Sequence, residues 1–570
     1  MVLSSQHLAK IYECRPFKTR NADEFDLSSV LDLFVDPTDG LKSPFDFENA
    51  IIKGRMGSGK TMYLRANYAY YLYTVVPCLL NNTDVILPIY IRLSDFQNIP
   101  STIEIYNKII IKIIQEMTTA YLNFKDTKKL ANLHNGIQTL SLKTINQDEK
   151  IQRMLVELGK LTSDEYVEKS TKIFNGKLNL PMDFCNLSAE YNKQVEFQLK
   201  KKPNAGIEDL IAAYNTLLRP FNGSVLILID EAGSINKSFF KEQEDVSMFE
   251  TLMNQLRTLN FIRTKIAIYP QTYSDILLET RYGDAIILQE DIRNNKGYIN
   301  FENRCISLIE KYIENFSAIK CKTEEIFDIE TERMDVLEQL INASDGNMRR
   351  FVHLVDSTLH NAFKENHGMD KVMISHVYSA LREDARSLEQ LFSNTEIDFL
   401  DVLSSTCKAR STYKFRFPNK SIDLHRYINK SSEYNIIKLV EPGSGRKGTV
   451  YGFDYAYSIY KEIPTHNIKD TDRIDKQRSK ETGQWINKIT TIDDNIIEHS
   501  KIHKIEGKVD YVSEDNSGFI IGDDNNRYFF NKSMIIDNDK NKKIHIGTRM
   551  RFLPYAHNDS LFAYYTEILS

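Results

Sequence analysis

One glycine-rich segment, Gly54 to Thr61, restricts the fold of this chain more than any other part of its sequence. It reads GRMGSGKT and satisfies the pattern GxxxxGK[ST]. The apolar run Ala50–Ile52 precedes it, and residues 62–72 continue with a helical pattern. A buried strand, a glycine loop and a helix in that order are typical of a parallel α/β sheet. The sequence therefore predicts an α/β domain that begins near residue 50.

The residue types in this loop indicate a site for the phosphates of a nucleotide. Its glycines let the backbone turn so that N–H groups point at phosphate oxygens, and the following helix contributes its positive end. Lys60 is expected to reach the β and γ phosphates, and the Thr61 hydroxyl to ligate Mg²⁺. ATP with Mg²⁺ is thus the expected pair of cofactors, and the flanking elements disfavour a chance match on a glycine-rich loop. The candidate nucleotide-binding residues are Gly54, Arg55, Met56, Gly57, Ser58, Gly59, Lys60, Thr61 and Met62.

An acidic pair, Asp230 and Glu231, follows the apolar run Ser224–Ile229. Because parallel strands deliver their carboxyl ends to the edge of the sheet where ligands bind, we expect Asp230 to hold magnesium through water. Glu231 is then placed to orient or deprotonate the attacking water. A polar pair that merely ends a strand is the alternative, and the upstream glycine loop disfavours it. The two motifs together predict hydrolysis of a nucleoside triphosphate, which makes the chain an ATPase.

Further apolar and amphipathic runs predict the rest of the architecture. Continuous apolar runs at 85–93 and 265–269 predict two more strands of the parallel sheet. The predicted units are an extended lead-in at 1–49, a nucleotide-binding core at 50–290 with a helical insertion at about 120–205, a helical lid at 291–392, a smaller helical unit with a glycine-rich loop at 393–465, a polar linker at 466–501 and a small β-barrel at 502–570.

Weaker signals add further candidates around the nucleotide. Gln271 and Thr272 follow the strand at 265–269, where a polar side chain can touch the γ phosphate or the water, although a simple turn explains them equally. Arg349 opens a lid helix and can swing onto the phosphates as the lid closes, although a lone arginine is more often solvated. Arg281 and Arg257 are candidates for an arginine finger donated to a neighbouring subunit.

The order of these motifs resembles an AAA+ ATPase. The resemblance rests on the P-loop (Walker A), the Asp230–Glu231 strand end (Walker B), the polar residue after the fourth strand and Gly346-x-x-Arg349 in a helical lid. The unit at about 395–463, which ends in a glycine-rich loop, is similar to the winged helix that binds duplex DNA in the origin-recognition initiator clade.

The resemblance covers about residues 25–463 and has two departures. The P-loop lacks the proline that is more usual in the clade, and the helical insertion is foreign to the minimal core, so replication initiation is not implied. Such a series of domains also occurs in bacterial ATPases of mobile-element and phage-defence loci.

The C-terminal units carry candidate nucleic-acid contacts. Residues 507–552 resemble a cold-shock-type OB barrel, in which Tyr511, Phe519 and Phe529 match the base-stacking aromatics approximately. An OB fold that uses its aromatics in its own core is an equal alternative. In the winged-helix-like unit, the cations that can neutralise phosphates are Lys408, Arg410, Lys414 and Arg416, with Arg446 and Lys447 at the wing tip. A solvated surface is the usual explanation for so short a basic run.

Composition excludes several classes of protein. The net charge of −5 means that any nucleic-acid surface must be local. The 6 cysteines form no CxxC pair, which disfavours zinc sites and disulfide frameworks. The N-terminus lacks a secretory signal, and no run approaches the ~18–20 apolar residues that span a bilayer. We therefore expect a cytoplasmic protein with no membrane partner.

These patterns together predict an ATP-binding and ATP-hydrolysing protein that binds DNA through its C-terminal units. It is expected to assemble through its nucleotide site as a homo-oligomer or with a partner ATPase subunit. The alternative belongs to a different class: a signalling or scaffold protein in which bound nucleotide locks a conformation, with little turnover, and the C-terminal units recruit a protein partner.

Overall fold

The computed structural model describes residues 5–37, 43–80, 83–133, 206–230, 237–240, 247–268, 283–329, 335–410, 412–416, 435–441, 449–463, 489–492, 504–513, 516–535, 539, 542–557 and 560–569. The predicted helical insertion lies outside these residues from 134 to 205.

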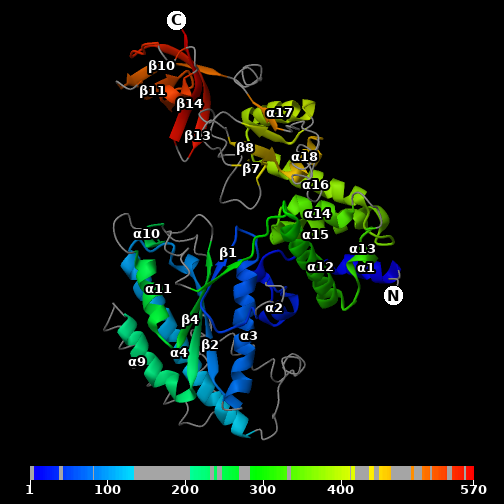
Figure 1. The fold of residues 1–570 in the computed structure, drawn as a ribbon, viewed down its shortest axis with the longest axis vertical. Coiled ribbons are helices and arrows are strands. Elements are labelled where there is room, and N and C mark those ends of the chain that lie inside the picture. Colours follow the sequence, from blue (N-terminus) through cyan, green and yellow to red (C-terminus); the bar gives the residue numbers. More distant parts are fainter. Residues whose placement is uncertain are drawn as a thin grey trace, which may run out of the picture.

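A five-stranded parallel sheet forms the centre of the predicted nucleotide-binding core (Figure 1). Its strands are β1 (Ala50–Lys53), β2 (Val85–Arg92), β3 (Gly223–Asp230), β4 (Ile262–Ile268) and β5 (Asp284–Ile287). Their order is β2-β3-β4-β1-β5, and every neighbouring pair is parallel. The predicted α/β class is confirmed. The sequence did not predict β5, because its four residues are mostly exposed and lack the continuous apolar run of a central strand.

Helices cover both faces of this sheet because its strand side chains alternate between them. On β3, Leu226 and Leu228 face one apolar cluster, whereas Val225, Ile227 and Ile229 face the other. The first face is covered by α3 (Lys60–Leu80), and the second by α4 (Thr102–Leu133), α9 (Ile207–Leu217), α10 (Lys237–Phe240) and α11 (Met248–Thr258). Short 3₁₀ turns lie at Ala22–Glu24, Leu93–Phe96, Arg219–Phe221 and Lys532–Met534.

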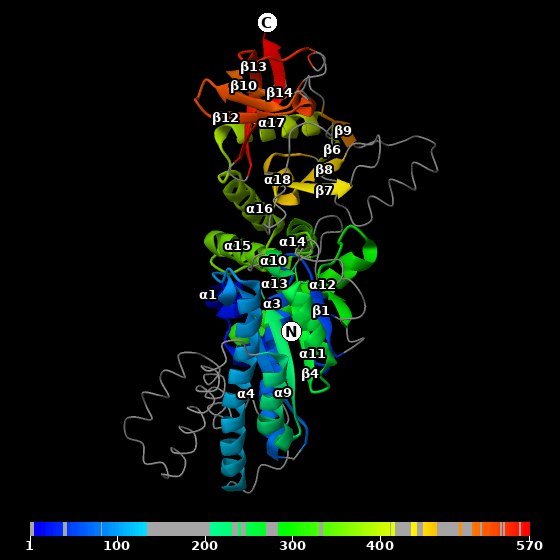
Figure 2. The same cartoon turned by 90° about the vertical axis from the view of Figure 1, so that its left-hand side faces the viewer.

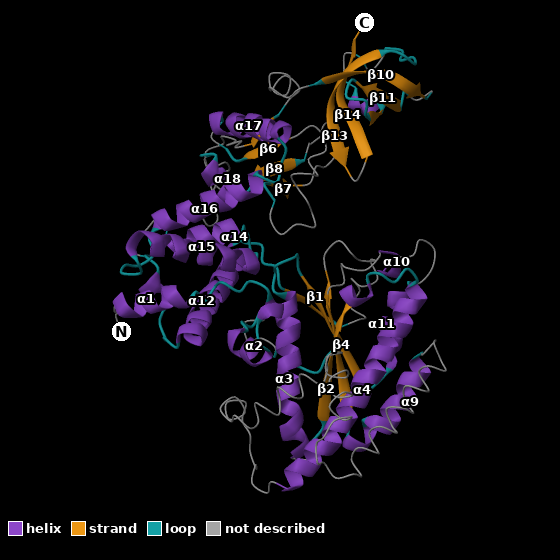
Figure 3. Cartoon of the chain, turned by 180° about the vertical axis from the view of Figure 1, so that it is seen from behind, coloured by secondary structure: helices purple, strands orange, loops and turns teal. Residues whose placement is uncertain are grey.

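The N-terminal segment corrects one expectation. We expected an extended lead-in, but residues 5–37 contain α1 (Ser5–Cys14) and α2 (Leu27–Leu33). Helix α1 forms because Leu8, Ile11 and Tyr12 recur on one face and are buried. Tyr12 packs on Phe363 of the lid with ring centroids 6.1 Å apart, so α1 joins the lid rather than the sheet. Helix α2 lies closer to the core, against α3 (Figure 3).

The lid is helical, as predicted. Its helices are α12 (Asn295–Ser317), α13 (Thr323–Ile326), α14 (Val336–Ser344), α15 (Met348–Asn366) and α16 (Ile374–Glu389). Side chains at three N-caps, Asn294, Asp335 and Asn347, accept backbone N–H groups of the first turns of α12, α14 and α15. A left-handed Asp345 (φ 54°) ends α14, so the chain turns sharply into α15.

A third unit follows the lid. It contains α17 (Asn394–Ala409), β6 (Lys414–Arg416), β7 (Ile437–Glu441), β8 (Val450–Phe453), α18 (Tyr455–Tyr460) and β9 (Ile489–Thr491). The strands form a sheet in the order β7-β8-β6-β9. Strand β9 lies within the stretch for which a polar linker was expected, and it pairs in parallel with β6. In Figure 2 this unit lies between the lid and the C-terminal barrel.

The C-terminal barrel was predicted and is present. Its strands are β10 (Ile505–Val512), β11 (Gly518–Gly522), β12 (Arg527–Phe530), β13 (Arg549–His557) and β14 (Ser560–Leu569). They close in the order β10-β11-β12-β14-β13 around a core that includes Val509, Ile520, Tyr528, Phe530 and Phe552. Among the described residues, no helix is both long and apolar enough to cross a bilayer.

Candidate nucleotide site

The glycine loop turns between β1 and α3 as its sequence predicts. Gly57 and Gly59 have φ values of 79° and 96°, which residues with a side chain rarely adopt. A Cβ on Gly54 would lie 2.2 Å from the Ser58 Oγ, whereas one on Gly59 would meet nothing within 4 Å. The Gly59 backbone therefore borders open space at the N-terminus of α3, where a phosphate can approach it.

Lys60 is the first residue of α3, and its side chain folds back over the loop. Its Nζ donates to the carbonyl oxygens of Gly54 (2.6 Å) and Arg55 (2.8 Å). Only 5% of Lys60 is exposed. Burial lowers the pKa of Lys60 to about 7, against the opposing effect of Asp230, while Arg349 lowers it further. Lys60, Asp230 and Arg349 thus lie within electrostatic range of one another.

Asp230 ends β3 beside the loop, as predicted, and it is 3% exposed. The hydroxyl of Tyr90, on the neighbouring β2, donates to its Oδ2 at 2.6 Å. Burial, followed by the charge of Asp230, raises the pKa of Tyr90 well above its ordinary value, so this hydroxyl stays protonated and donates. Tyr90 therefore fixes one oxygen of the carboxylate that the sequence assigns to magnesium.

The lid closes directly on the glycine loop. The Asn347 side chain donates to the Met56 carbonyl oxygen at 2.9 Å, and the Arg349 N–H donates to the Gly57 carbonyl oxygen at 3.0 Å. A Cβ on Gly57 would lie 2.4 Å from the Asn347 Oδ1, so only glycine permits this approach. Lid and loop are therefore in direct hydrogen-bond contact.

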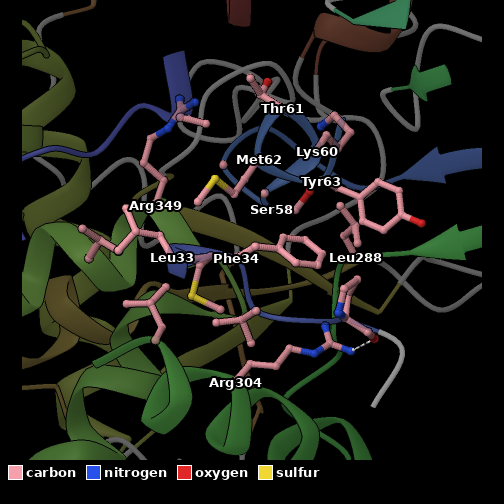
Figure 4. Close-up of a pocket in the computed structure, with 18 of the residues that line it drawn as sticks. Leu33, Phe34, Ser58, Lys60, Thr61, Met62, Tyr63, Leu288, Arg304 and Arg349 are labelled. Atoms are coloured by element: carbon pink, nitrogen blue, oxygen red, sulfur yellow. Dashed lines mark hydrogen bonds between the residues drawn. The ribbon is translucent and has the colours of Figure 1, made fainter. Parts of the chain in front are cut away.

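A cavity of about 120 Å³ lies between the loop, the lid and the N-terminal segment. Figure 4 shows the loop residues at one end, Arg304 at the other, and Leu33 with Phe34 between them. The residues along the apolar part of the wall include Leu33, Phe34, Val35, Leu288, Phe301, Leu308, Met348 and Val352. One end of the cavity is thus polar and cationic, and the remainder is largely apolar.

Three buried polar atoms, two in the cavity wall and one elsewhere in the P-loop, have no hydrogen-bond partner among the described residues. They are the Ser58 Oγ, the Arg55 Nε and the Arg304 Nε. Because a buried polar group without a partner is costly, such atoms indicate where a ligand supplies the missing contact. Ser58 and Arg304 both line the cavity, one at each end.

The protein oxygen atoms near the loop are too few to hold Mg²⁺ alone, and they suit it only if phosphates of a bound nucleotide supply further oxygens. Thr61 lines the cavity, and Asp230 lies within electrostatic range of Lys60. The described residues contain no group of three or more His, Cys, Asp and Glu side chains that could bind a metal alone. Mg²⁺ usually keeps several waters and takes one or two protein oxygens together with substrate phosphates, which fits this sparse set.

One known protein family matches the part of the chain that contains the P-loop. Residues 15–241 match the family model described as ORC-CDC6-like. The match confirms, for these residues, the resemblance to the origin-recognition clade that the motifs predict. The matched segment includes helix α2, the P-loop and Asp230, whereas α1 precedes it.

Two solved structures from Aeropyrum pernix are also similar to the chain. The ORC1 protein in complex with DNA is 13% identical, with 76% of this chain and 90% of that chain covered and a TM-score of 0.28. The ORC2 protein, in ADPNP–ADP complexes, is 11% identical, with 75% and 90% covered and a TM-score of 0.30. Likenesses at such TM-scores support no statement about this chain. No curated protein matches its sequence.

Several predicted residues lie outside the described part of the chain. They are Glu231, Gln271, Thr272, Arg281, Arg446 and Lys447. The roles expected for them stay predictions. Arg257 is described, and it lies exposed in the last turn of α11.

The predicted aromatics of the barrel gather on its outer surface. Tyr511 is 51% exposed and pairs across strands with Phe519. The rings of Phe519 and Phe529 lie 5.6 Å apart, and the Arg527 guanidinium covers the Phe519 ring at 4.3 Å. Phe562 extends the row, 6.0 Å from Phe529. The barrel core is filled by other side chains, so these rings are not needed to fill it.

The cations expected in the third unit are dispersed. Lys408 pairs with Glu462 at 2.8 Å near the end of α17, and Arg410 caps that helix. Lys414 and Arg416 lie on β6, where the Lys414 Nζ is 5.3 Å from the centre of the Tyr413 ring.

Sequence reasoning missed residues that act through packing. Tyr90, Asp345, Arg304 and Phe562 belong to no motif, and Asn347 is an unassigned position within one. Each of the five meets its partner only after folding. One signal was available for Asn347, because it stands inside the Gly346-x-x-Arg349 motif and precedes a helix as an N-cap does.

Proposed function

We propose that the chain binds ATP with Mg²⁺ in the cavity between the P-loop and the lid, and hydrolyses it. One observation carries the proposal: Lys60 and Thr61 line the same cavity as Arg349 of the lid, and the lid is hydrogen-bonded to the loop. A triphosphate supplies the negative charge that this polar end lacks. The apolar remainder of the cavity suits the base and ribose.

The phosphates would lie on the N-terminus of α3. Ser58, Gly59 and Lys60 face the cavity there, and the Ser58 hydroxyl has no hydrogen-bond partner among the described residues. Lys60 already donates to two carbonyl oxygens. A phosphate oxygen would compete with those carbonyls for Lys60, and a charge-assisted bond would favour the phosphate.

Thr61 and Asp230 would hold Mg²⁺ together with phosphate oxygens and water. The metal would neutralise charge on the terminal phosphates during transfer to water. The chain's own part is to hold Asp230 in place, which Tyr90 does from β2. Glu231, the next residue, is proposed to orient the attacking water, and Arg349 to contact the phosphates from the lid.

The base would lie among the apolar residues, near Arg304. Arg304 donates to the Pro37 carbonyl oxygen at 2.5 Å and to Glu290 at 2.9 Å, while its Nε lacks a partner among the described residues. An N–H at this place would donate to a ring nitrogen of a purine. Pyrimidine bases offer acceptors too, so the proposal of ATP rests on the P-loop motif and not on this contact.

The C-terminal units are proposed to contact DNA. The outer surface of the barrel offers Tyr511, Phe519, Phe529 and Phe562, and Arg527 stacks on one of them. Exposed aromatic rings stack on unpaired bases, and neighbouring cations hold the backbone. This arrangement favours a single-stranded nucleic acid at the barrel over the use of these rings in the core. The third unit would hold duplex DNA through the cations on α17 and β6.

The test is the ATPase rate of the full chain with no DNA, single-stranded DNA and duplex DNA, with particle mass measured in ATP. The proposal expects Mg²⁺-dependent turnover that DNA stimulates, and Glu231→Gln should retain ATP while losing hydrolysis. A larger mass in ATP would support an arginine finger from a neighbour, with Arg281 or Arg257 as the donor. Slow turnover that is indifferent to DNA would instead support a nucleotide-switched signalling protein.

A further inference from the structure

A row of alternating charges connects the P-loop to the third unit. Arg55, the second residue of the P-loop, contacts the Asp345 Oδ2 through its Nη1 at 2.9 Å. The Nζ of Lys438, on β7, contacts the same oxygen at 3.2 Å and the Asp454 Oδ1 at 2.8 Å. Asp345 lies between α14 and α15 of the lid, and Asp454 caps α18. The core, the lid and the third unit are thus joined through the carboxylates of Asp345 and Asp454.

The far end of the row is buried and bonded on several sides. Arg350 donates to both oxygens of Asp454, at 2.7 and 2.8 Å, and to Asp384 at 2.9 Å. Asp454 also accepts the backbone N–H groups of Ala456 and Tyr457. Arg350 is 2% exposed and Asp454 is fully buried. This end therefore anchors the third unit to lid helices α15 and α16.

The near end is less buried and lies on a strained backbone. The side chains of Lys438 and Asp345 are 24% and 28% exposed. Asp345 has a left-handed φ of 54°, and Gly346, which follows it, has φ 71° and packs against the Glu290 carbonyl. Although burial opposes it, Lys438 and then Arg55 hold the pKa of Asp345 below its ordinary value. Asp345 is therefore ionised at neutral pH and attracts both cations.

The row reaches the phosphate-binding atoms through Arg55. Its guanidinium also donates to the Asp345 carbonyl oxygen, and its own carbonyl oxygen accepts the Lys60 Nζ at 2.8 Å. A shift of Lys438 would therefore change the charge that Arg55 faces. A shift of Arg55 would in turn move an oxygen that competes with phosphate for Lys60.

We propose that Asp345 and Lys438 are positioning residues of the nucleotide site, through which the third unit tunes the affinity of the P-loop for nucleotide. The proposal rests on the proposed function and adds its regulation. Because coupling between two sites is reciprocal, nucleotide binding would change the affinity of the third unit for DNA by the same factor. The element that transmits the change is β7, which carries Lys438 (Figure 3).

The experiment compares full-length wild type with Lys438→Met, Lys438→Arg and Asp345→Asn. Equilibrium binding of a fluorescent ATP analogue with Mg²⁺ is measured with and without saturating duplex DNA. Lys322→Met is the matched control, because Lys322 forms an exposed lid ion pair with Glu310 at 3.3 Å, away from the row. Circular dichroism and thermal unfolding confirm that the variants are folded, and the two Lys438 variants keep the test intact if Asp345→Asn misfolds.

Lys438→Met is expected to change nucleotide affinity by roughly 3- to 10-fold, because such couplings are modest. The ratio of nucleotide affinity with DNA to that without DNA should fall close to one. Lys438→Arg keeps the positive charge, so it should keep the nucleotide affinity and the response to DNA of the wild type. Lys322→Met should also leave both quantities as in wild type. Asp345→Asn combined with Lys438→Met should change affinity less than the sum of the single changes.

Two results would overturn the inference while leaving the proposed function standing. One is a Lys438→Met protein whose nucleotide affinity and response to DNA equal those of wild type. The other is a loss of the same size in Lys322→Met. Absence of nucleotide binding in the wild type would instead remove the proposed function and the inference with it.

Discussion

The cavity beside the P-loop and the outer surface of the barrel both carry candidate binding residues, but they are built differently. In the cavity, Lys60 and Asp230 are almost fully buried, and residues from other elements hold them. On the barrel, Tyr511 is half exposed, and Arg527 of β12 pairs with Asp510 of β10, with both side chains exposed to water. Loss of a buried partner leaves a polar group unsatisfied, whereas water replaces an exposed one. Changes near the cavity should therefore be large and coupled, and changes on the barrel small and additive.

The largest effect is expected behind the cavity, at Arg350. Arg350→Met removes the buried cation that Asp384 and Asp454 share, and it leaves Lys438 beside Asp454 and His353 beside Asp384. Breaking a buried pair in this way costs about 3–5 kcal/mol. Urea unfolding of the full chain, followed by circular dichroism, should show an earlier transition of the lid and third unit. Lys322→Met, which breaks an exposed pair, should cost about 1 kcal/mol or less. If the two variants lower the unfolding free energy equally, buried and exposed ion pairs do not differ in the way proposed.

Lys60→Ala should have the next largest effect, on turnover. The side chain is expected to contact the phosphates as they gain charge in the transition state, and loss of one such donor costs about 100- to 1,000-fold in rate. The measurement is single-turnover hydrolysis of ATP at saturating Mg²⁺. Lys112→Ala is the control, because Lys112 lies on α4 in an exposed pair with Asp95 at 3.2 Å. If Lys60→Ala hydrolyses ATP at the rate of the control, the loop is not the catalytic site.

The contrast also explains what could be predicted from the sequence. The P-loop and Asp230 were predicted because each is a local pattern: glycines at fixed spacing, or acids directly after an apolar strand. Tyr90 and Asn347 were not, because Tyr90 and Asp230 stand 140 residues apart and Asn347 and Met56 stand 291 apart. Such pairs are set by which strands and helices pack together, and one sequence does not specify that packing.

Secondary structure shows the same limit. The buried strands of the sheet were predicted because they are continuous apolar runs, but β5 was missed because its residues are mostly exposed. The lead-in was expected to be extended, and the short amphipathic pattern of α1 was missed. On the barrel, Phe519 and Phe529 were predicted from a family motif, whereas Phe562 joins them only when β14 pairs with β12.

A smaller effect is expected on the barrel. Phe519→Ala should weaken binding of single-stranded DNA by roughly 5- to 100-fold, because loss of one base-stacking ring costs about 1–3 kcal/mol. Fluorescence anisotropy with a labelled oligonucleotide gives the affinity. Ile521→Ala is the control, since Ile521 lies on the same strand, is 42% exposed and has no ring. A loss of equal size in both variants would indicate general surface disruption rather than stacking.

The smallest effect is expected at Tyr90. It tests whether a residue outside the P-loop influences Mg²⁺ binding through its hydrogen bond to Asp230. Tyr90→Phe removes only the hydroxyl that donates to Asp230 at 2.6 Å. Because a typical hydrogen bond contributes about 0.5–1.5 kcal/mol, the Mg²⁺ concentration that half-saturates ATP binding should rise by roughly 2- to 10-fold. Nucleotide affinity without Mg²⁺ should stay the same, since Tyr90 acts on the phosphates only through the carboxylate.

Tyr106→Phe is the matched control for this change. Its hydroxyl also donates at 2.6 Å, to the Gln255 side chain on α11, which is not a cavity residue. The two substitutions delete the same atom from hydrogen bonds of the same length, so their costs in folding stability should be similar. Only Tyr90→Phe should shift the Mg²⁺ titration. If both variants shift it alike, the hydroxyl of Tyr90 supports the fold and not the carboxylate that is proposed to bind Mg²⁺.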